Sequence, residues 1–190
     1  MRTPRIQRLV VAAVLVFAAR VAWADHCPED RTASAAPETS LAGVDVIRDK
    51  VPDVLARLGK PTSHKEGREA DYPVGSGWAD YEWKYSRATV SMSTEFYTSD
   101  TGARVEAVEL IQMSGTSSRA PLCTGKGLRL GDEVKRVLAL YGTTYVEGTV
   151  NGPELGKRTM TYCFSDETEL SIGLTADSHV VAMWLHAPVE

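Results

Sequence analysis

The string DTGA, Asp100 to Ala103, is the place in the sequence that looks most equipped for catalysis. Two aspartates that share one proton can activate water for peptide hydrolysis, and an Asp-Thr-Gly-Ala turn can hold one of them. The chain contains no second Asp-Thr-Gly or Asp-Ser-Gly, so only a dimer could complete the pair. Because tight turns also prefer Asp and Gly, the sequence favours a hairpin turn at Asp100 over an aspartic peptidase-like dimer.

The other residues with catalytic or ligand-binding chemistry do not form a group. CTGKG, Cys123 to Gly127, lacks the spacing of a phosphate-binding loop and is better explained as a Gly-rich connection that leads into a helix. No Ser or Cys has the setting of a nucleophile, and no Cys or His lies at metal-ligand spacing from another. The histidines are scattered along the chain: His26, His64, His179 and His186. We therefore predict a protein that is not an enzyme, with no cofactor and no metal.

The first residues have the pattern of an export signal. Three arginines precede the apolar run LVVAAVLVFAA, and Ala22-Trp23-Ala24 fits the small-x-small rule for cleavage before Asp25. A membrane-spanning helix needs about 20 apolar residues, so cleavage is favoured over retention as an anchor. We predict a signal peptide at 1–24, a flexible leader at 25–40, and a periplasmic or secreted mature chain with no stable membrane insertion.

The charge of the mature chain limits its partners. Removing residues 1–24 takes away four arginines and no acidic residue, so the formal net charge falls from −4 to −8. A chain with this net negative charge is a poor match for nucleic acid or an anionic membrane. The partner that remains is a protein, which the sequence does not identify.

The cysteine count is odd. In an exported protein, Cys27, Cys123 and Cys163 predict one bridge with one leftover thiol, or a bridge between chains. Cys27 falls in the leader, whereas Cys123 and Cys163 both lie beside predicted regular structure. We therefore predict a disulfide between Cys123 and Cys163, and leave the state of Cys27 open.

Two short segments repeat one helical pattern. They are DKVPDVLARLG (49–59) and DEVKRVLALYG (132–142), offset by 83 residues. Each has apolar residues at positions i, i+3, i+4 and i+7, an Asp at the expected N-cap, and a Gly at its end. The pattern predicts two amphipathic helices, capped by Asp49 and Asp132 and terminated by Gly59 and Gly142.

Each helical segment is followed by a polar loop and three alternating runs that predict strands. The runs are 81–85, 88–97 and 104–113 after the first helix, and 159–164, 167–175 and 179–186 after the second. The predicted fold class is therefore α+β, with two tandem repeats of a helix and an antiparallel meander. We place the repeats at 41–115 and 116–190, with the helices on one face of the sheet or sheets. Side by side, the two meanders could form one sheet of six to eight strands.

The motif GD-x4-V-x4-G, followed by W-x-Y and a meander, resembles the β-lactamase inhibitory protein family. It is also similar to the small lipoproteins of the outer-membrane β-barrel assembly machine. The matching stretches are LGDEVKRVLALYG (130–142), its degenerate partner IRDKVPDVLARLG (47–59), and YEWKY (81–85). The resemblance implies a non-enzymatic protein-binding role, as an inhibitor or an envelope component. The chain departs from the inhibitory proteins in having a candidate cysteine pair only in its second half.

Aromatic residues are the candidate contact residues for a protein partner. Trp and Tyr are common hot spots in interfaces, and a sheet face not covered by helices could present them. On the last strand of each half, Val108 and Leu110 match Met183 and Leu185 as core positions, which turns Trp184 to the other face. Tyr81, Trp83 and Tyr85 alternate along the predicted strand 81–85. They could instead be core residues that pack beneath the first helix. The candidates are Trp184, Trp78, Tyr72, Trp83, Tyr81 and Tyr85.

These features lead to one functional prediction and two alternatives. The leading prediction is an exported binding module that presents an aromatic sheet face and mobile loops to a protein partner. The first alternative is a structural or assembly factor of the bacterial envelope. The second is an aspartic peptidase-like dimer that uses Asp100.

Overall fold

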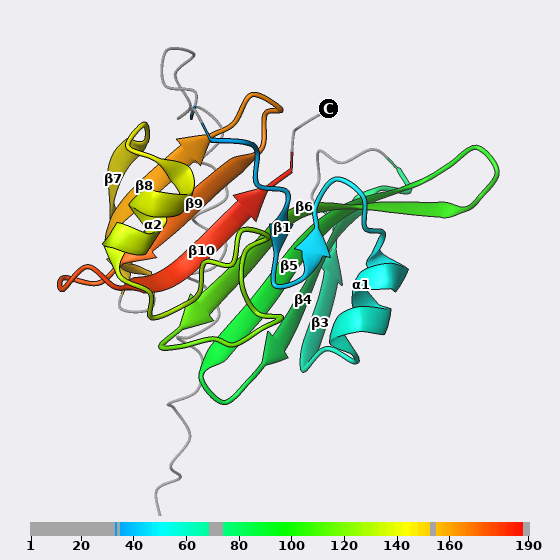
Figure 1. Ribbon diagram of the computed structural model, residues 1–190. Coiled ribbons are helices and arrows are strands. Elements are labelled where there is room, and N and C mark those ends of the chain that lie inside the picture. Colours follow the sequence, from blue (N-terminus) through cyan, green and yellow to red (C-terminus); the bar gives the residue numbers. More distant parts are fainter. Residues whose placement is uncertain (1–32, 34, 69–73, 153–154, 188–190) are drawn as a thin grey trace, which may run out of the picture.

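A computed structural model of the chain describes residues 33, 35–68, 74–152 and 155–187. Within these ranges, eight antiparallel strands form one sheet in the order β3-β4-β5-β6-β10-β9-β8-β7 (Figure 1). A short ribbon, β1–β2, and two helices complete the fold. The elements are β1 (Ser40–Leu41), β2 (Val44–Asp45), α1 (Val51–Leu58), β3 (Ser63–Gly67), β4 (Gly77–Lys84), β5 (Ala88–Thr98), β6 (Arg104–Gly115), α2 (Val134–Tyr141), β7 (Val146–Gly152), β8 (Gly156–Cys163), β9 (Glu169–Leu174) and β10 (Val180–His186).

Alternation of side chains gives the large sheet one apolar face and one mostly polar face. One apolar row crosses six strands and contains Trp83, Val90, Met113, Met183, Ile172 and Met160. The next row on the same face contains Tyr81, Met92, Ile111, Leu185, Leu170 and Tyr162. The row between them faces the other way and contains Glu82, Ser91, Gln112, Trp184, Ser171 and Thr161. The two apolar rows belong to the hydrophobic core, which also contains the buried residues of both helices.

Each helix ends at a glycine that is tied to the sheet by an aromatic side chain. Gly59 and Gly142 end α1 and α2 with φ of 79° and 83°. The indole Nε1 of Trp83 donates a hydrogen bond to the Gly59 carbonyl oxygen at 2.9 Å, and the hydroxyl of Tyr162 donates to the Gly142 carbonyl oxygen at 3.0 Å. The last turn of a helix leaves carbonyl groups without intrahelical partners. These two bonds place both C-terminal ends against the apolar face of the sheet.

The predicted helices are present, but the predicted N-caps are not. Lys50 and Glu133 occupy the N-cap positions, and neither makes a side-chain capping bond. The predicted caps face backwards along the chain instead. Asp49 Oδ2 accepts from the Asp45 N–H at 2.9 Å, and Asp132 Oδ2 accepts from the Arg129 N–H at 2.9 Å. These aspartates therefore close the turn before each helix.

The predicted fold class, an α+β fold of two helix-plus-meander repeats, was wrong. The chain is mainly β, with 48% of the described residues in strands or bridges and 11% in helix. Each helix has 8 residues and buries only two of them fully, so the long strands, not the helices, supply most of the core. Pairing of β6 with β10 joins the strands into one sheet of eight, which agrees with the expectation of one sheet of six to eight strands. The sequence ranges assigned to the domains remain predictions.

The six predicted strands are present, but a bulge changes which residues of β6 face the core. The β5–β6 register shifts between Ser93, which pairs with Leu110, and Thr94, which pairs with Val108. The extra residue reverses the alternation at this point. Val108 and Ile111 therefore both face the core, at 4% and 0% exposure. Leu110 lies in the row of His186 and was wrongly predicted to be core.

Candidate functional site

Most of the predicted aromatic contact residues are buried. Exposure is 9% for Trp78, 6% for Tyr81, 3% for Trp83 and 7% for Trp184. Tyr81 and Trp83 belong to the core on the helix-bearing face. Tyr85, just past the end of β4, is 41% exposed. Tyr72 lies outside the described residues, as do the predicted signal peptide, most of the predicted leader and Cys27.

Trp184 lies on the sheet face opposite the helices, as predicted from the alternation of β10. Its neighbours Met183 and Leu185 are core residues at 0% exposure, and Trp184 is not part of the hydrophobic core. Its flanking residues in the same row are Gln112 and Ser171. At 7% exposure, however, Trp184 presents little surface to a partner.

A polar network crosses four strands on the helix-bearing face. The Glu106 side chain of β6, 12% exposed, accepts hydrogen bonds from the hydroxyls of Tyr81 (β4, 3.0 Å) and Thr94 (β5). Arg104 donates to Glu106 Oε2 through Nε at 3.2 Å and Nη2 at 3.1 Å, and to Glu66 Oε1 of β3 through Nη1 at 3.0 Å. Burial, and next the bond to Glu106, raises the pKa of Tyr81, so its hydroxyl stays a donor. We call these five residues the cross-strand latch.

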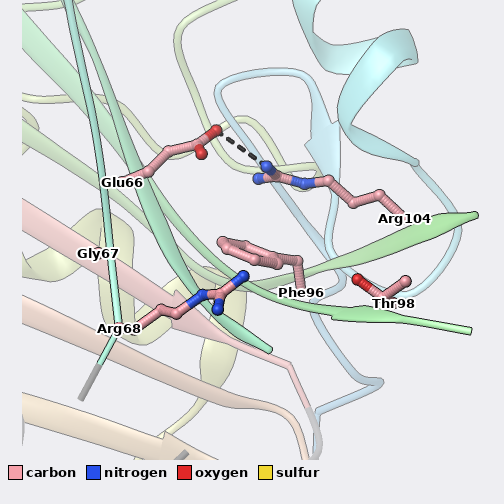
Figure 2. Close-up of a pocket in the computed structure, with 6 residues that line it drawn as sticks. All are labelled: Glu66, Gly67, Arg68, Phe96, Thr98 and Arg104. Carbon is pink, nitrogen blue, oxygen red and sulfur yellow. Dashed lines mark hydrogen bonds and ion pairs between the residues drawn. The ribbon is translucent and has the colours of Figure 1, made fainter. Parts of the chain in front are cut away.

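A shallow depression of about 360 Å³ lies beside the latch (Figure 2). The ring of Phe96 forms its centre, and the guanidinium carbon of Arg104 lies 3.8 Å from the ring centroid. Stacking of this kind is a favourable cation–π contact. Figure 2 shows Arg68, the residue after the end of β3, reaching toward the same ring. The lining residues are Glu66, Gly67, Arg68, Phe96, Thr98 and Arg104.

The β5–β6 hairpin continues beyond the strands that flank it. β4 pairs with β5 only as far as Phe96, and β10 pairs with β6 only from Leu110 onward. Figure 1 shows this ribbon extending past the rest of the sheet. Tyr97 and Val105 are directly opposite each other on it and are 55% and 40% exposed. The ribbon thus holds an accessible apolar pair in a defined register.

The hairpin tip contains Asp100, the predicted turn residue of DTGA. The Ser99 N–H donates to the Ala103 carbonyl at 2.8 Å, and the Gly102 N–H donates to the Ser99 carbonyl at 2.8 Å. Gly102 has a φ of 78°, a conformation that favours glycine. The hairpin turn predicted from the sequence is confirmed, and Asp100 is exposed at its tip.

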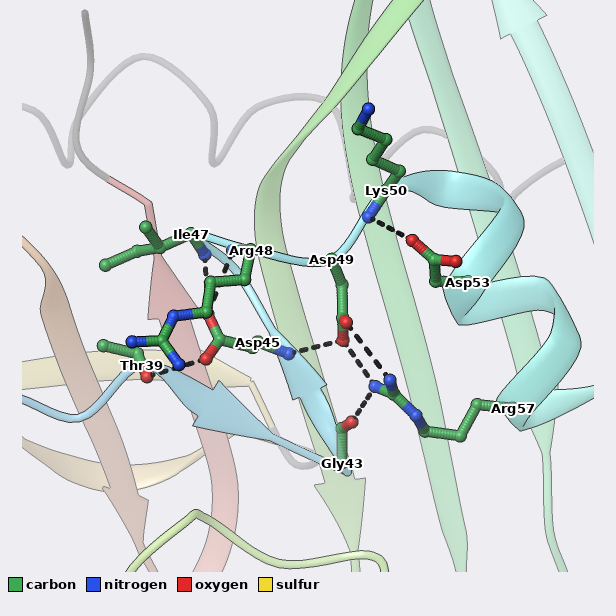
Figure 3. Close-up of polar contacts among 9 residues, drawn as sticks. All are labelled: Thr39, Gly43, Asp45, Ile47, Arg48, Asp49, Lys50, Asp53 and Arg57. Atoms are coloured by element: carbon green, nitrogen blue, oxygen red, sulfur yellow. Dashed lines mark hydrogen bonds and ion pairs between the residues drawn. The ribbon is translucent and has the colours of Figure 1, made fainter.

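A second polar cluster joins the segment before α1 to the helix (Figure 3). The N–H groups of Ile47 and Arg48 donate to Asp45 Oδ1 at 3.0 and 3.1 Å. Asp49 forms a bidentate ion pair with Arg57, in which Nη2 donates to Oδ1 at 3.1 Å. The hydrogen bond to Arg57 is the main cause that lowers the pKa of Asp49. This cluster positions the helix against the segment that precedes it.

Glu38 anchors the segment before β1 to the loop before α2. Its carboxylate is buried, at 3% exposure of the residue. Oε1 accepts from the N–H groups of Ser40 (3.2 Å) and Gly125 (3.1 Å). Oε2 accepts from the Lys126 N–H (3.1 Å) and the Tyr141 hydroxyl (2.8 Å). Burial lowers the pKa of the Lys126 ammonium, which lies 4.8 Å from the centroid of the Tyr141 ring.

The predicted disulfide between Cys123 and Cys163 is not formed, because Cys123 is a free thiol. The two residues lie on opposite faces of the sheet. Cys123 is in the loop before α2, on the helix side, where its carbonyl accepts from the Ala42 N–H at 2.9 Å. Cys163 follows the core residue Tyr162 on β8, so its side chain faces away from the helices.

The described residues contain no cluster of three or more His, Cys, Asp or Glu side chains placed to hold a metal ion. The same part of the chain also has no helix with the length and apolarity needed to cross a bilayer. No protein-family model, curated protein or solved structure matches the chain.

Sequence reasoning missed the latch, the Glu38 anchor and the exposed pair. Glu66 and Arg104 are 38 residues apart in sequence, and Glu38 and Tyr141 are 103 apart, so no local pattern connects them. The exposed pair did leave a signal. Phe96 and Tyr97 are consecutive aromatics in a strand, and alternation requires one of them to face away from the core.

Proposed function

We propose that this chain is an exported, non-enzymatic module that binds a protein partner through the β5–β6 ribbon. The observation that carries the proposal is the pair formed by Tyr97 and Val105. The two side chains are opposite each other in register and are 55% and 40% exposed. Tyrosine is enriched among residues that dominate binding energy, because its ring offers a large contact area and its hydroxyl a hydrogen bond.

Rigidity at the base of the ribbon supports this role. An isolated two-stranded hairpin is only marginally stable in water. Here the cross-strand latch ties Arg104, at the start of β6, to Glu66 on β3 and Glu106 on its own strand. A contact surface that is ordered before binding loses less conformational entropy when the partner arrives.

The proposal includes two settings for the partner. A soluble inhibitor of a secreted hydrolase would remain in the soluble fraction after cell disruption. A component of an envelope assembly would sediment with membranes through its partner. Fractionation of the native host separates these two settings, and neither changes the proposed contact surface.

Affinity capture from envelope extract tests the proposal. The bait is the exported chain, either unchanged or with Tyr97→Ala and Val105→Ser together. We expect the unchanged bait to retain a defined partner. The double variant should bind that partner at least about 30-fold more weakly, since hot-spot truncations cost about 2 kcal/mol or more. Both substituted side chains are exposed, so the free energy of unfolding should stay within about 0.5 kcal/mol.

A control bait with Lys135→Ala and Lys157→Ala changes two exposed residues of α2 and β8, far from the ribbon in the strand order. This bait should retain the partner. Equal retention by the ribbon variant and the unchanged bait would refute the proposed surface. Capture of nothing beyond a tag-only bait would refute the proposed role.

A further inference from the structure

The depression beside the cross-strand latch lies on the opposite face of the ribbon from the exposed pair. Phe96 points to the helix-bearing face, and its strand neighbour Tyr97 points to the other. The depression has a volume of about 360 Å³ and is open to solvent. A partner that wraps around the ribbon would therefore meet both surfaces.

The two arginines of the depression differ in their partners. Arg104 is neutralised by Glu66 at 3.0 Å and by Glu106 at 3.1 Å. Arg68 is exposed and has no ion-pair partner within the described part of the chain. Because Glu66 and Glu106 compensate Arg104, Arg68 supplies the positive charge of the lining that has no ion-pair partner among the described residues. The fork of Arg68 is thus available to bind an anion bidentately.

The depression contains the mostly buried ring of Phe96 beside this charge. A Cβ at Gly77 would lie 2.9 Å from Phe96 Cζ and 3.1 Å from Arg68 Cγ, so the ring and the arginine stem meet over this glycine. Thr98 donates its hydroxyl hydrogen to the Gly75 carbonyl at 3.0 Å. Its oxygen therefore remains available to accept a hydrogen bond from an amide N–H. A ring, a guanidinium and an acceptor lie within one small site.

We infer that this depression binds a carboxylate of the partner polypeptide, held by the guanidinium of Arg68. The inference rests on the proposed function, because it names what the partner presents to the same ribbon. A carboxylate carries one negative charge, which matches the single charge of Arg68. A phosphate dianion would exceed that charge, and Glu66 would repel it more strongly than it repels a carboxylate. The carboxylate belongs either to the C-terminus of the partner or to an acidic side chain.

Amide-detected NMR titration of the exported chain with small peptides tests the site directly. The probes are acetyl-alanyl-leucine with a free C-terminal carboxylate, acetyl-glutamyl-leucinamide with a side-chain carboxylate, and acetyl-alanyl-leucinamide with neither. We expect saturable shifts around Phe96 and Arg68 with at least one carboxylate peptide, at a Kd of about 1–10 mM for such small ligands. The neutral amide should bind at least about tenfold more weakly. Comparing the first two probes identifies the source of the carboxylate.

Two variants complete the test. Arg68→Gln removes the available charge and should weaken binding about tenfold, the size expected for a charge-assisted bond. Arg87→Gln changes an exposed arginine in the β4–β5 turn and should leave binding within about twofold. The inference is overturned if neither carboxylate peptide binds near Phe96, if the neutral amide binds equally well, or if Arg68→Gln has no effect. Because the titration needs no partner, it can fail while capture through Tyr97 succeeds, and the reverse also holds.

Discussion

Replacing Glu38 by glutamine should destabilise the fold by about 3 kcal/mol. Glutamine keeps the shape of the side chain but has one acceptor oxygen where glutamate has two. In the native fold each carboxylate oxygen accepts two hydrogen bonds. Three of these four bonds come from backbone N–H groups, and the fourth comes from the Tyr141 hydroxyl. In either orientation, the amide NH2 of glutamine would face two donors.

The expected loss of stability is worked out for the less costly orientation of the glutamine amide. With the NH2 near the Lys126 N–H and the Tyr141 hydroxyl, the hydroxyl can turn to Thr124 Oγ1, which is 2.7 Å away. The substitution then loses two bonds to a charged acceptor, each worth about 1.5–3 kcal/mol. Part of this loss is offset because a neutral side chain costs less to bury. A net loss of about 3 kcal/mol corresponds to a fall in Tm of about 6–12 °C for a domain of this size.

Urea unfolding followed by circular dichroism at pH 7 measures the effect. The matched control is Glu167→Gln, since Glu167 is exposed in the β8–β9 turn, and it should change the free energy of unfolding by less than about 0.5 kcal/mol. If Glu38→Gln unfolds within about 0.5 kcal/mol of the unchanged chain, the buried carboxylate does not anchor the segment. The reasoning about that contact would then be wrong.

Three further predictions concern other parts of the fold. Asp49→Asn should cost about 1 kcal/mol at pH 7, a value reduced by solvent screening at the exposed Arg57. Because the folded-state pKa of Asp49 is lowered, this contribution should disappear as the pH falls below the ordinary value of 3.8; a pH-independent difference in urea unfolding would contradict the ion pair. Trp83→Phe should cost about 1–3 kcal/mol, because it removes the donor to Gly59 and leaves unfilled space in the core; an unchanged Tm would contradict the anchoring of α1. Cys123 should react with maleimide in the folded chain, as peptide mapping would show, and protection of this thiol until unfolding would contradict its free and partly exposed state.

The strands and helices were predictable because their signals are local. Six alternating runs predicted six strands, and two stripes ending in Gly59 and Gly142 predicted two helices. The fold class was not predictable from these signals. It depends on the lengths of the elements: each helix ends after 8 residues, whereas β5 and β6 continue for 11 and 12.

Most of the candidate site could not be predicted from the sequence. A bulge in β6, opposite Ser93 and Thr94, adds one residue to that strand and reverses its alternation, so a strict period of two misplaced Leu110. The aromatic residues of β4 were chosen as contacts, yet Tyr81 and Trp83 fill the core. The exposed pair instead comes from the ribbon beyond the flanking strands, and its exposure depends on where β4 and β10 end.

Site-specific photocrosslinking in the native host tests the central claim most directly. A photoreactive phenylalanine analogue at position 97 would probe the ribbon. The same analogue at position 147 would probe β7, an edge strand of the sheet that is not next to the ribbon. Mass spectrometry would then identify the attached proteins. The account predicts one defined adduct from position 97 and none from position 147. No adduct from position 97, or the same adducts from both positions, would contradict it.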